Sequence, residues 1–216
     1  MICLLVGWLR QALARFSCGA PRKRLVLEEI GIRMKAACLA ALDELRAVLG
    51  SLDDDAVARA VEEIVSAKQI RLYDVGREGL PIKGLCMRLY HLGLQVAMVG
   101  DMTAPPLGPR DLLVASAGPS NFSTVAALMG VARDARARTL VVTAQPAGSA
   151  ARAADAVLHV PAQTMADDQI TTPSLLPMGS QFEGSEFAQF EALVLAVRDQ
   201  LTVTPERMRL RHTNLE

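Results

Sequence analysis

The sequence predicts a doubly wound α/β domain of three layers, with helices on both faces of a five-stranded parallel sheet. The first observation is composition: 51% of the 216 residues are hydrophobic and only 4% are aromatic, so Ala, Val and Leu must build the core. The second is an alternation of short β-branched runs with helical segments along the chain. The third is that each run is apolar throughout, as in strands that helices bury on both faces.

The strands follow one another at regular intervals from residue 69 onward. They are predicted at residues 69–73, 95–99, 111–115, 139–143 and 156–160. Helices are predicted between them near 81–92 and 123–135, with a short Ala-rich helix before the last strand. Helical crossovers keep such strands parallel, and the flavodoxin-like order 2-1-3-4-5 is a common arrangement.

Further helices are predicted on either side of this alternating region. Leucines recur at helical spacing from Leu39 to Leu49 ahead of Gly50, and Ser51 and Asp53 can cap a second helix. After the last strand, residues 163–177 read as a polar loop of a length typical of functional lids. A long helix is predicted at 179–201 and a short one at 205–211.

The domain is predicted to cover residues 34–216, behind an extension at 1–33 that we expect to be loosely attached and poorly ordered. The apolar stretch 2–9 is too short to span a bilayer. The four cysteines form no C-x-x-C pair, which favours idle thiols in a reducing compartment over disulfides or zinc. A cytoplasmic protein is therefore expected.

Charge balance restricts the partners. Lys plus Arg and Asp plus Glu both number 23, whereas nucleic acid and anionic membranes attract a basic surface. We expect neither as the partner. No His/Cys cluster suggests zinc, and the Gly-x-x-Gly of residues 76–79 is not a dinucleotide fingerprint, so no metal and no cofactor is predicted.

A ligand site is expected where the strand order reverses, between the first and third strands. The segments that meet there are 76–79 and 116–124. The second contains hydroxyl and amide side chains at a helix start, where free N–H groups favour an anion. Helix capping alone also explains such residues, so both interpretations stay open. The candidate ligand-binding residues from the two segments are Arg77, Glu78, Ser116, Gly118, Ser120, Asn121, Ser123 and Thr124.

Three other residues are candidates for chemistry. Glu183 falls in the first turn of the long helix, where the helix dipole favours a carboxylate even without a function. His91 is predicted at a helix C-terminus, a structural position for imidazolium. His212 lies in a polar tail with no core to satisfy it, which favours an active-site role, in this subunit or a neighbouring one.

Several motifs together resemble the sugar isomerase (SIS) domain family, and within it the 6-phospho-3-hexuloisomerases. The resemblance covers roughly residues 34–216. Its most specific parts are Arg88-Leu89-Tyr90-His91-Leu92-Gly93 and the tail from Met208 to Glu216. The other matching stretches are 76–80, 99–101 (which adds Asp101 to the candidate binding residues), 108–113, 141–144 and 178–183.

The resemblance implies a homotetrameric, cofactor-free isomerase that converts hexulose 6-phosphate to fructose 6-phosphate through a cis-enediol. By position, Glu183 matches the family's catalytic glutamate and His212 the histidine of its C-terminal signature. Glu183 would be the base that moves a proton between adjacent carbons. His212 or His91 would assist ring opening or move protons between oxygens.

The sequence departs from the family at the expected phosphate site. The family has Ser where this chain has Glu78, and Ser-Gly-Ser-Gly-Glu-Thr where it has residues 117–122, so Ala117 and Pro119 replace two hydroxyl donors. A carboxylate ~4 Å from a phosphate costs several kcal/mol at an intermediate dielectric. Arg77 either holds an anion or pairs with Glu78.

Three alternatives therefore stay open: an isomerase of a different sugar, either unphosphorylated or with its anion elsewhere, a non-catalytic sugar-binding SIS module, and an arabinose 5-phosphate isomerase. The last is disfavoured because such enzymes are usually longer.

Overall fold

The computed structural model describes residues 20–169 and 174–215, and side chains from residue 31 onward. The chain divides into two compact units, 1–42 and 43–216. Helix α2 (Ala20–Leu49) forms all of the first unit that is described. It begins well before residue 34, so residues 20–33 are helical where no regular element was expected. Residues 1–19 of the predicted extension lie outside the described residues.

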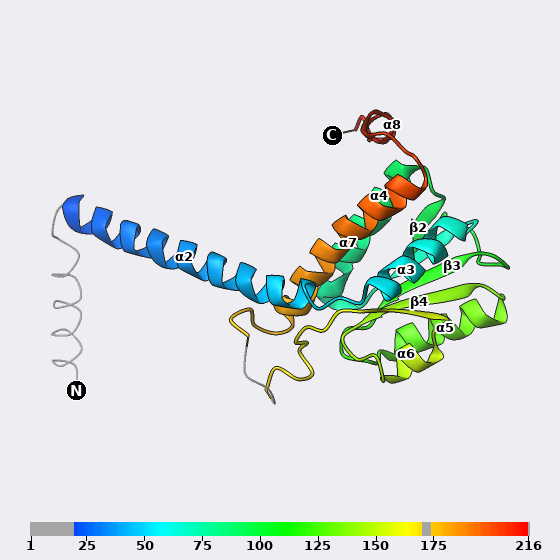
Figure 1. Cartoon of the computed structure of the whole chain (residues 1–216), viewed down its shortest axis with the longest axis horizontal. Helices are drawn as coiled ribbons and strands as arrows, with labels where there is room; N and C mark the ends of the chain where they lie inside the picture. Colours follow the sequence, from blue (N-terminus) through cyan, green and yellow to red (C-terminus); the bar gives the residue numbers. More distant parts are fainter. Residues whose placement is uncertain (1–19, 170–173, 216) are drawn as a thin grey trace, which may run out of the picture. The chain divides into compact units, whose positions relative to one another are not determined.

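A five-stranded parallel sheet forms the centre of the second unit, with strand order β2-β1-β3-β4-β5 (Figure 1). This confirms the predicted fold and strand order. Each predicted strand is present to within two residues at either end. The strands are β1 (Ile70–Tyr73), β2 (Val96–Met98), β3 (Leu112–Ser116), β4 (Arg138–Thr143) and β5 (Ala156–His159).

Helices cover both faces of the sheet. Successive strand residues point to opposite faces, so Leu112 packs with one helical layer and Leu113 with the other. The first layer is α3 (Asp54–Ser66), α4 (Gly79–Leu92) and α7 (Ser180–Gln200). The second is α5 (Ser123–Asp134) and α6 (Ser149–Ala153). A 3₁₀ turn, η1 (Gly76–Glu78), precedes α4, and α8 (Pro205–Arg209) follows α7.

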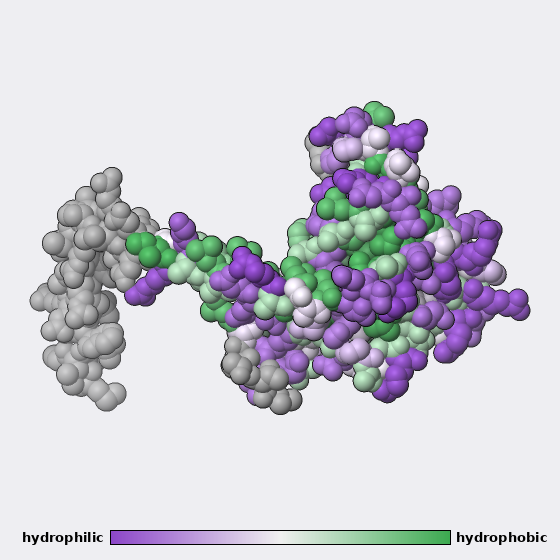
Figure 2. Space-filling model, in the orientation of Figure 1, coloured by the Kyte–Doolittle hydropathy of each residue, from purple (hydrophilic) through white to green (hydrophobic). Residues whose placement is uncertain are grey.

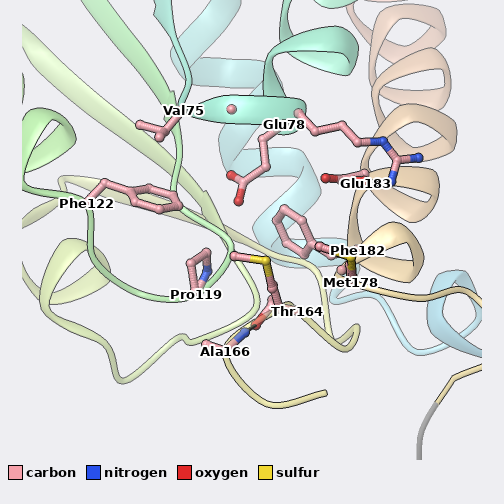
Figure 3. Close-up of a pocket in the computed structure, with 13 residues that line it drawn as sticks. Val75, Glu78, Pro119, Phe122, Thr164, Ala166, Met178, Phe182 and Glu183 are labelled. Carbon is pink, nitrogen blue, oxygen red and sulfur yellow. Dashed lines mark hydrogen bonds and ion pairs between the residues drawn. The ribbon is translucent and has the colours of Figure 1, made fainter. Parts of the chain in front are cut away.

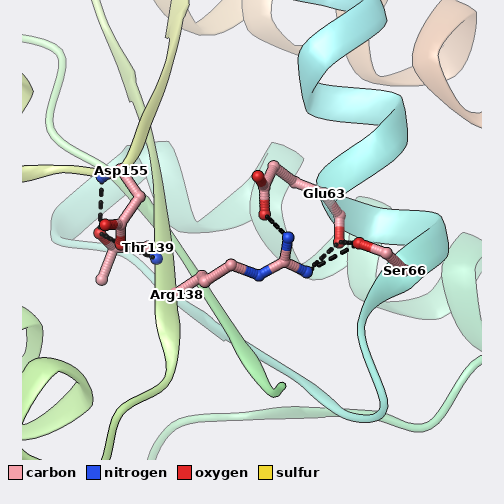
Figure 4. Close-up of polar contacts among 5 residues, drawn as sticks. All are labelled: Glu63, Ser66, Arg138, Thr139 and Asp155. Carbon is pink, nitrogen blue, oxygen red and sulfur yellow. Dashed lines mark hydrogen bonds and ion pairs between the residues drawn. The ribbon is translucent and has the colours of Figure 1, made fainter. Parts of the chain in front are cut away.

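Polar contacts connect the elements at the end of the sheet where the strands begin (Figure 4). Arg138, at the start of β4, pairs with Glu63 of α3 at 2.7 Å and donates to Ser66 Oγ at 2.7 Å. The backbone N–H and the hydroxyl of Thr139 both donate to Asp155 Oδ2, each at 2.8 Å. These contacts attach α3 and β5 to β4 at the amino-terminal ends of the strands, away from their carboxyl ends.

The end of α7 contains a residue under backbone strain. Thr202 has φ +55°, while its N–H bonds to Asp199 O and the N–H of Val203 bonds to Arg198 O. These are the two hydrogen bonds of a Schellman motif, whose C′ position favours glycine. A β-branched residue there carries a steric penalty of ~1–2 kcal/mol.

We therefore expect Thr202→Gly to raise the free energy of unfolding by about 1 kcal/mol, because the strain is relieved and both hydrogen bonds remain. Urea unfolding at fixed protein concentration measures the change. Thr213→Gly, at an exposed position of ordinary φ, is the control. Equal or lower stability of Thr202→Gly than of the parent chain would contradict the expectation.

None of the helices in the described part of the chain is long and apolar enough to cross a membrane.

Candidate active site

A pocket of about 530 Å³ opens at the carboxyl ends of β1 and β3, where the strand order reverses (Figure 3). Four segments form its wall: the β1–α4 connection, the loop after β3, the loop before α7, and the start of α7. The lining residues are Val75, Gly76, Arg77, Glu78, Pro119, Phe122, Thr164, Met165, Ala166, Met178, Gly179, Phe182 and Glu183. Most of this wall is apolar, and its charged side chains are Arg77, Glu78 and Glu183.

Glu183 is placed in the pocket by the first turn of α7. The helix starts after Gly179, whose φ of +81° suits glycine, and the Glu183 N–H bonds to Gly179 O. Arg77 Nη1 lies 2.7 Å from Glu183 Oε2 and donates to Ser180 Oγ at 2.6 Å. Burial raises the pKa of Glu183 and Arg77 opposes that rise, so the ion pair favours the ionised carboxylate.

Glu78 turns inward from η1, with 8% of its surface exposed. Its Oε2 accepts hydrogen bonds from Ser116 Oγ at 2.5 Å and from Gly118 N–H at 3.1 Å. Gly118 is needed for this approach, since a Cβ there would lie 2.9 Å from both Glu78 Oε1 and the Phe182 ring. Burial raises the pKa of Glu78, the two donors oppose the rise, and Glu183 and Asp74 add to it.

Glu186 is a third carboxyl group that the sequence analysis did not single out. It lies one turn beyond Glu183 on α7 with 0% exposure, and neither carboxyl oxygen has a hydrogen-bond partner among the described residues. Burial raises its pKa well above the ordinary value, and Glu78, Glu183 and Asp74 add to that rise, against a weaker opposing effect of Ser116. Burial therefore favours the protonated form of this carboxyl group.

The loop after β3 differs from the hydroxyl-lined surface that was expected. Ser116 and the Gly118 N–H are already bonded to Glu78, and Ser120, at φ +92°, accepts from the Ser149 N–H at 3.2 Å. Asn121 lines a separate cavity of about 170 Å³. Pro119 and Phe122 form the wall instead.

Three more candidate binding residues lie outside the pocket wall. Ser123 and Thr124 are exposed in the first turn of α5. Asp101 is exposed in the turn after β2, where its Oδ2 accepts from the Met98 N–H. Binding roles for these residues and for the β3 loop stay predictions. Of the proposed binding residues, Arg77 and Glu78 line the pocket.

His91 and His212 form a separate pair. Their rings stack with centroids 5.3 Å apart, and Arg211 Nη1 donates to His91 O at 3.1 Å. His91 is at the carboxyl end of α4, whereas the amino end of α4 adjoins the pocket. A helix of 14 residues is ~20 Å long, so within one chain these histidines lie far from Glu183.

The long loop before α7 was predicted to be functional, and its Thr164, Met165 and Ala166 do line the pocket. Met178 and Phe182 fall in the matching stretch 178–183 but were not chosen as site residues, because apolar side chains near a helix start read as core. The described residues contain no group of three or more His, Cys, Asp or Glu side chains placed to hold a metal ion.

Curated relatives identify the family. The chain is 33% identical over 174 residues to the 3-hexulose-6-phosphate isomerase of Mycobacterium gastri, covering 81% of this chain and 87% of that protein. The chain belongs to the 3-hexulose-6-phosphate isomerase family. A Bacillus subtilis protein of the same name is 26% identical over 175 residues, covering 81% of this chain and 95% of its own length.

Solved structures share the fold of this family. A crystal structure of a protein described as hypothetical superposes with a TM-score of 0.76 at 26% identity, covering 85% of this chain and 98% of the other. A scan against models of known protein families gives no match. The resemblance to sugar-phosphate isomerases of the SIS fold, first seen in the sequence motifs, is therefore confirmed.

Proposed function

We propose that this chain isomerises a hexulose 6-phosphate, moving the carbonyl group between two adjacent carbons, with Glu183 as the base. The observation that carries the proposal is the Glu183 carboxylate on the pocket wall, paired at 2.7 Å with Arg77. Removal of a proton α to a carbonyl needs an ionised base within reach of substrate, and Arg77 favours that ionised form. The family name of the relatives supports the same substrate class.

In the proposed reaction, the Glu183 carboxylate takes the proton from the carbon beside the carbonyl group, which leaves a cis-enediol. The same group then returns the proton to the neighbouring carbon. One carboxylate on one face of the substrate is enough, because the two carbons are adjacent. The apolar wall around Phe122 and Phe182 excludes water from the enediol, which strengthens the electrostatic contacts inside the site.

Arg77 is the proposed anchor for the substrate phosphate. Its contacts to Glu183 and Ser180 both use Nη1, while a guanidinium has five N–H donors. Its side chain is 59% exposed, at the pocket entrance. Ser116 and the Gly118 N–H, which were candidates for binding the substrate, are bonded to Glu78 instead. We therefore place the phosphate at Arg77 rather than on the β3 loop.

We further propose that the chain forms a homo-oligomer, with a tetramer as the expected state. Helices α4 and α7 lie side by side, and their outer faces show apolar surface (Figure 2). Leu80, Met87, Tyr90, Phe187 and Leu195 are each 45–68% exposed there. A role for His212 in the site of a neighbouring subunit stays a prediction. Light scattering should give a mass well above the 23.2 kDa of one chain.

The test is conversion of hexulose 6-phosphate to fructose 6-phosphate in D₂O, followed by NMR. We expect turnover with deuterium incorporated at the carbon that gains hydrogen, because a carboxyl base exchanges its proton with solvent. The unphosphorylated sugars are the matched substrates. Turnover of these alone would move the assignment to a free ketose. Binding of the sugar phosphate, seen as a rise in Tm, without turnover or exchange would favour a sugar-sensing module.

A further inference from the structure

The pocket presents a second carboxyl group beside Glu183. Glu78 and Glu183 both line the cavity, one from η1 and the other from α7 (Figure 3). The hydrogen bonds of Glu78 all end on Oε2, from Ser116 and Gly118. No described residue bonds to Oε1. This carboxyl group is held rigidly by one oxygen and has the other available to a ligand, an arrangement suited to proton transfer.

We propose that Glu78 is a second catalytic residue, the acid–base group that moves a proton between the two substrate oxygens while Glu183 moves the proton between the two carbons. This inference rests on the proposed isomerase function. Isomerisation by an enediol requires both transfers, since the carbonyl oxygen gains a proton and the hydroxyl oxygen loses one. His91 and His212, which were expected to do this, lie at the far end of α4 within the same chain.

The step balances without any added reactant. Glu183 takes the carbon-bound proton, the C–H electron pair forms the C=C bond, and the carbonyl oxygen accepts a proton from Glu78. The enediol is then neutral, with Glu183 protonated and Glu78 ionised. In the second half, Glu78 takes the proton from the other oxygen, which becomes the oxygen of the new carbonyl group. Glu183 gives its proton to the carbon that carried the original carbonyl group. Both carboxyl groups return to their starting states.

The surroundings of the two carboxyl groups favour Glu183 as the base at carbon and Glu78 as the acid–base group at oxygen. Glu183 faces the guanidinium of Arg77, which stabilises a carboxylate. Glu78 is buried and faces Glu183 and Glu186 from α7 and Asp74 from the end of β1, with Arg77 as its neighbour in η1. Burial raises the pKa of Glu78, and the charges of Glu183 and Asp74 add to that rise against the Ser116 and Gly118 donors, so its surroundings favour the protonated form as the acid of the cycle. Two carboxyl groups with opposite environments commonly act as acid and base.

A protonated Glu78 also removes an objection to a phosphorylated substrate. An ionised carboxylate near a phosphate is repulsive, whereas a neutral carboxyl group is not. Ser116 and the Gly118 N–H are then positioning groups for an acid rather than phosphate ligands. Their donation to Oε2 leaves the proton of the acid on Oε1, the oxygen toward the pocket.

The test is the steady-state kinetics of Glu78→Gln with hexulose 6-phosphate across pH, against Glu62→Gln as the matched control. Glu62 is exposed on α3, away from the pocket wall and from the outer face of α4 and α7. Glutamine keeps the shape of Glu78 but cannot transfer a proton. We expect kcat to fall by ~10²–10⁴-fold with KM changed only a few-fold, and the decline in rate at alkaline pH to vanish. The control should match the parent chain.

A second variant keeps the inference testable should Glu78→Gln fail to fold. Ser116→Ala removes a donor that stabilises the ionised form of Glu78, so the pKa of Glu78 should rise and the alkaline limb of the rate profile should move to higher pH. A purely structural role for Ser116 would lower the amount of folded enzyme and leave that limb in place, which would overturn the inference.

The outcomes separate the two proposals. Full kcat in Glu78→Gln together with an inactive Glu183→Gln would overturn the role of Glu78 and leave the isomerase function intact. A gain in turnover for Glu78→Ser, which removes the carboxyl group and keeps a hydroxyl, would show that Glu78 obstructs the substrate and would also overturn it. A parent chain without turnover on any of the sugars would overturn both.

Discussion

Glu183→Gln should reduce kcat for hexulose 6-phosphate by at least ~10²-fold and by up to ~10⁴-fold, the range for loss of a general base. Glutamine occupies the same volume and still contacts Arg77, but it cannot accept the carbon-bound proton. Because the phosphate is placed at Arg77, KM should stay within a few-fold of that of the parent chain. Stopped assays of fructose 6-phosphate formation measure kcat, and deuterium exchange into substrate in D₂O should fall in parallel.

An exposed glutamate on another helix supplies the control for this result. Glu62→Gln makes the identical chemical change on α3 and should leave kcat unchanged. A thermal-shift titration with fructose 6-phosphate should give similar stabilisation of Glu183→Gln and the parent chain, which separates loss of chemistry from loss of binding. Undiminished deuterium exchange into substrate by the Glu183→Gln enzyme would contradict the assignment of this residue as the base.

A substitution of Arg77, the cation paired with Glu183, gives a second prediction for the same site. Arg77 lowers the pKa of Glu183 against the effect of burial, so Arg77→Gln should raise that pKa. The acidic limb of the rate profile should then move to higher pH, because the base must be ionised. KM for the phosphorylated sugar should rise as well, since the proposed phosphate anchor is lost. An unmoved acidic limb would contradict the coupling between Arg77 and Glu183.

The fold was predictable because its signals are local. Apolar runs such as 112–116 are buried on both faces, with exposures of 0–1% for Leu112, Leu113, Val114 and Ala115, so their pattern has only one stable interpretation. The strand order is one of the common doubly wound arrangements, which share parallel strands and right-handed crossovers. The position of the pocket follows in turn, because the point where the strand order reverses is set by topology alone.

The site itself was only partly predictable, because rotamers and burial decide it. A sequence shows that Glu78 adjoins the site but not that its carboxylate turns inward to take the donors of Ser116 and Gly118. Glu186 gave no signal, since a carboxylate in an amphipathic helix usually faces solvent. The His91–His212 pair shows the opposite error, in which sequence motifs suggest site residues that the fold keeps apart from the pocket. Motif matching placed both residues near the chemistry, and the length of α4 separates them from it within one chain.

Glu186→Met should raise the free energy of unfolding at pH 7 by about 1–4 kcal/mol, as found when buried ion pairs are replaced by hydrophobic residues of similar volume. The folded protein holds Glu186 protonated in the core without a hydrogen-bond partner among the described residues, while the unfolded chain ionises it freely. The free energy of unfolding contributed by this group is therefore fully present below the ordinary glutamate pKa of about 4.5 and declines as pH rises toward the raised pKa of the folded state.

This decline is the part of the prediction that distinguishes burial of a titrating group from simple repacking. Between pH 5 and the raised pKa, one such group lowers the free energy of unfolding by ~1.4 kcal/mol per pH unit. Glu186→Met should remove the contribution of Glu186 to the slope of the free energy of unfolding against pH. Glu78, Glu183 and Asp74, whose pKa values are also raised, should leave a smaller slope of the same sign. Urea unfolding at pH 5, 6, 7 and 8, at one protein concentration, measures this slope, with Glu62→Met as the exposed control. Parallel pH dependence in Glu186→Met and the parent chain would mean that Glu186 is ionised in the folded protein and has a partner there.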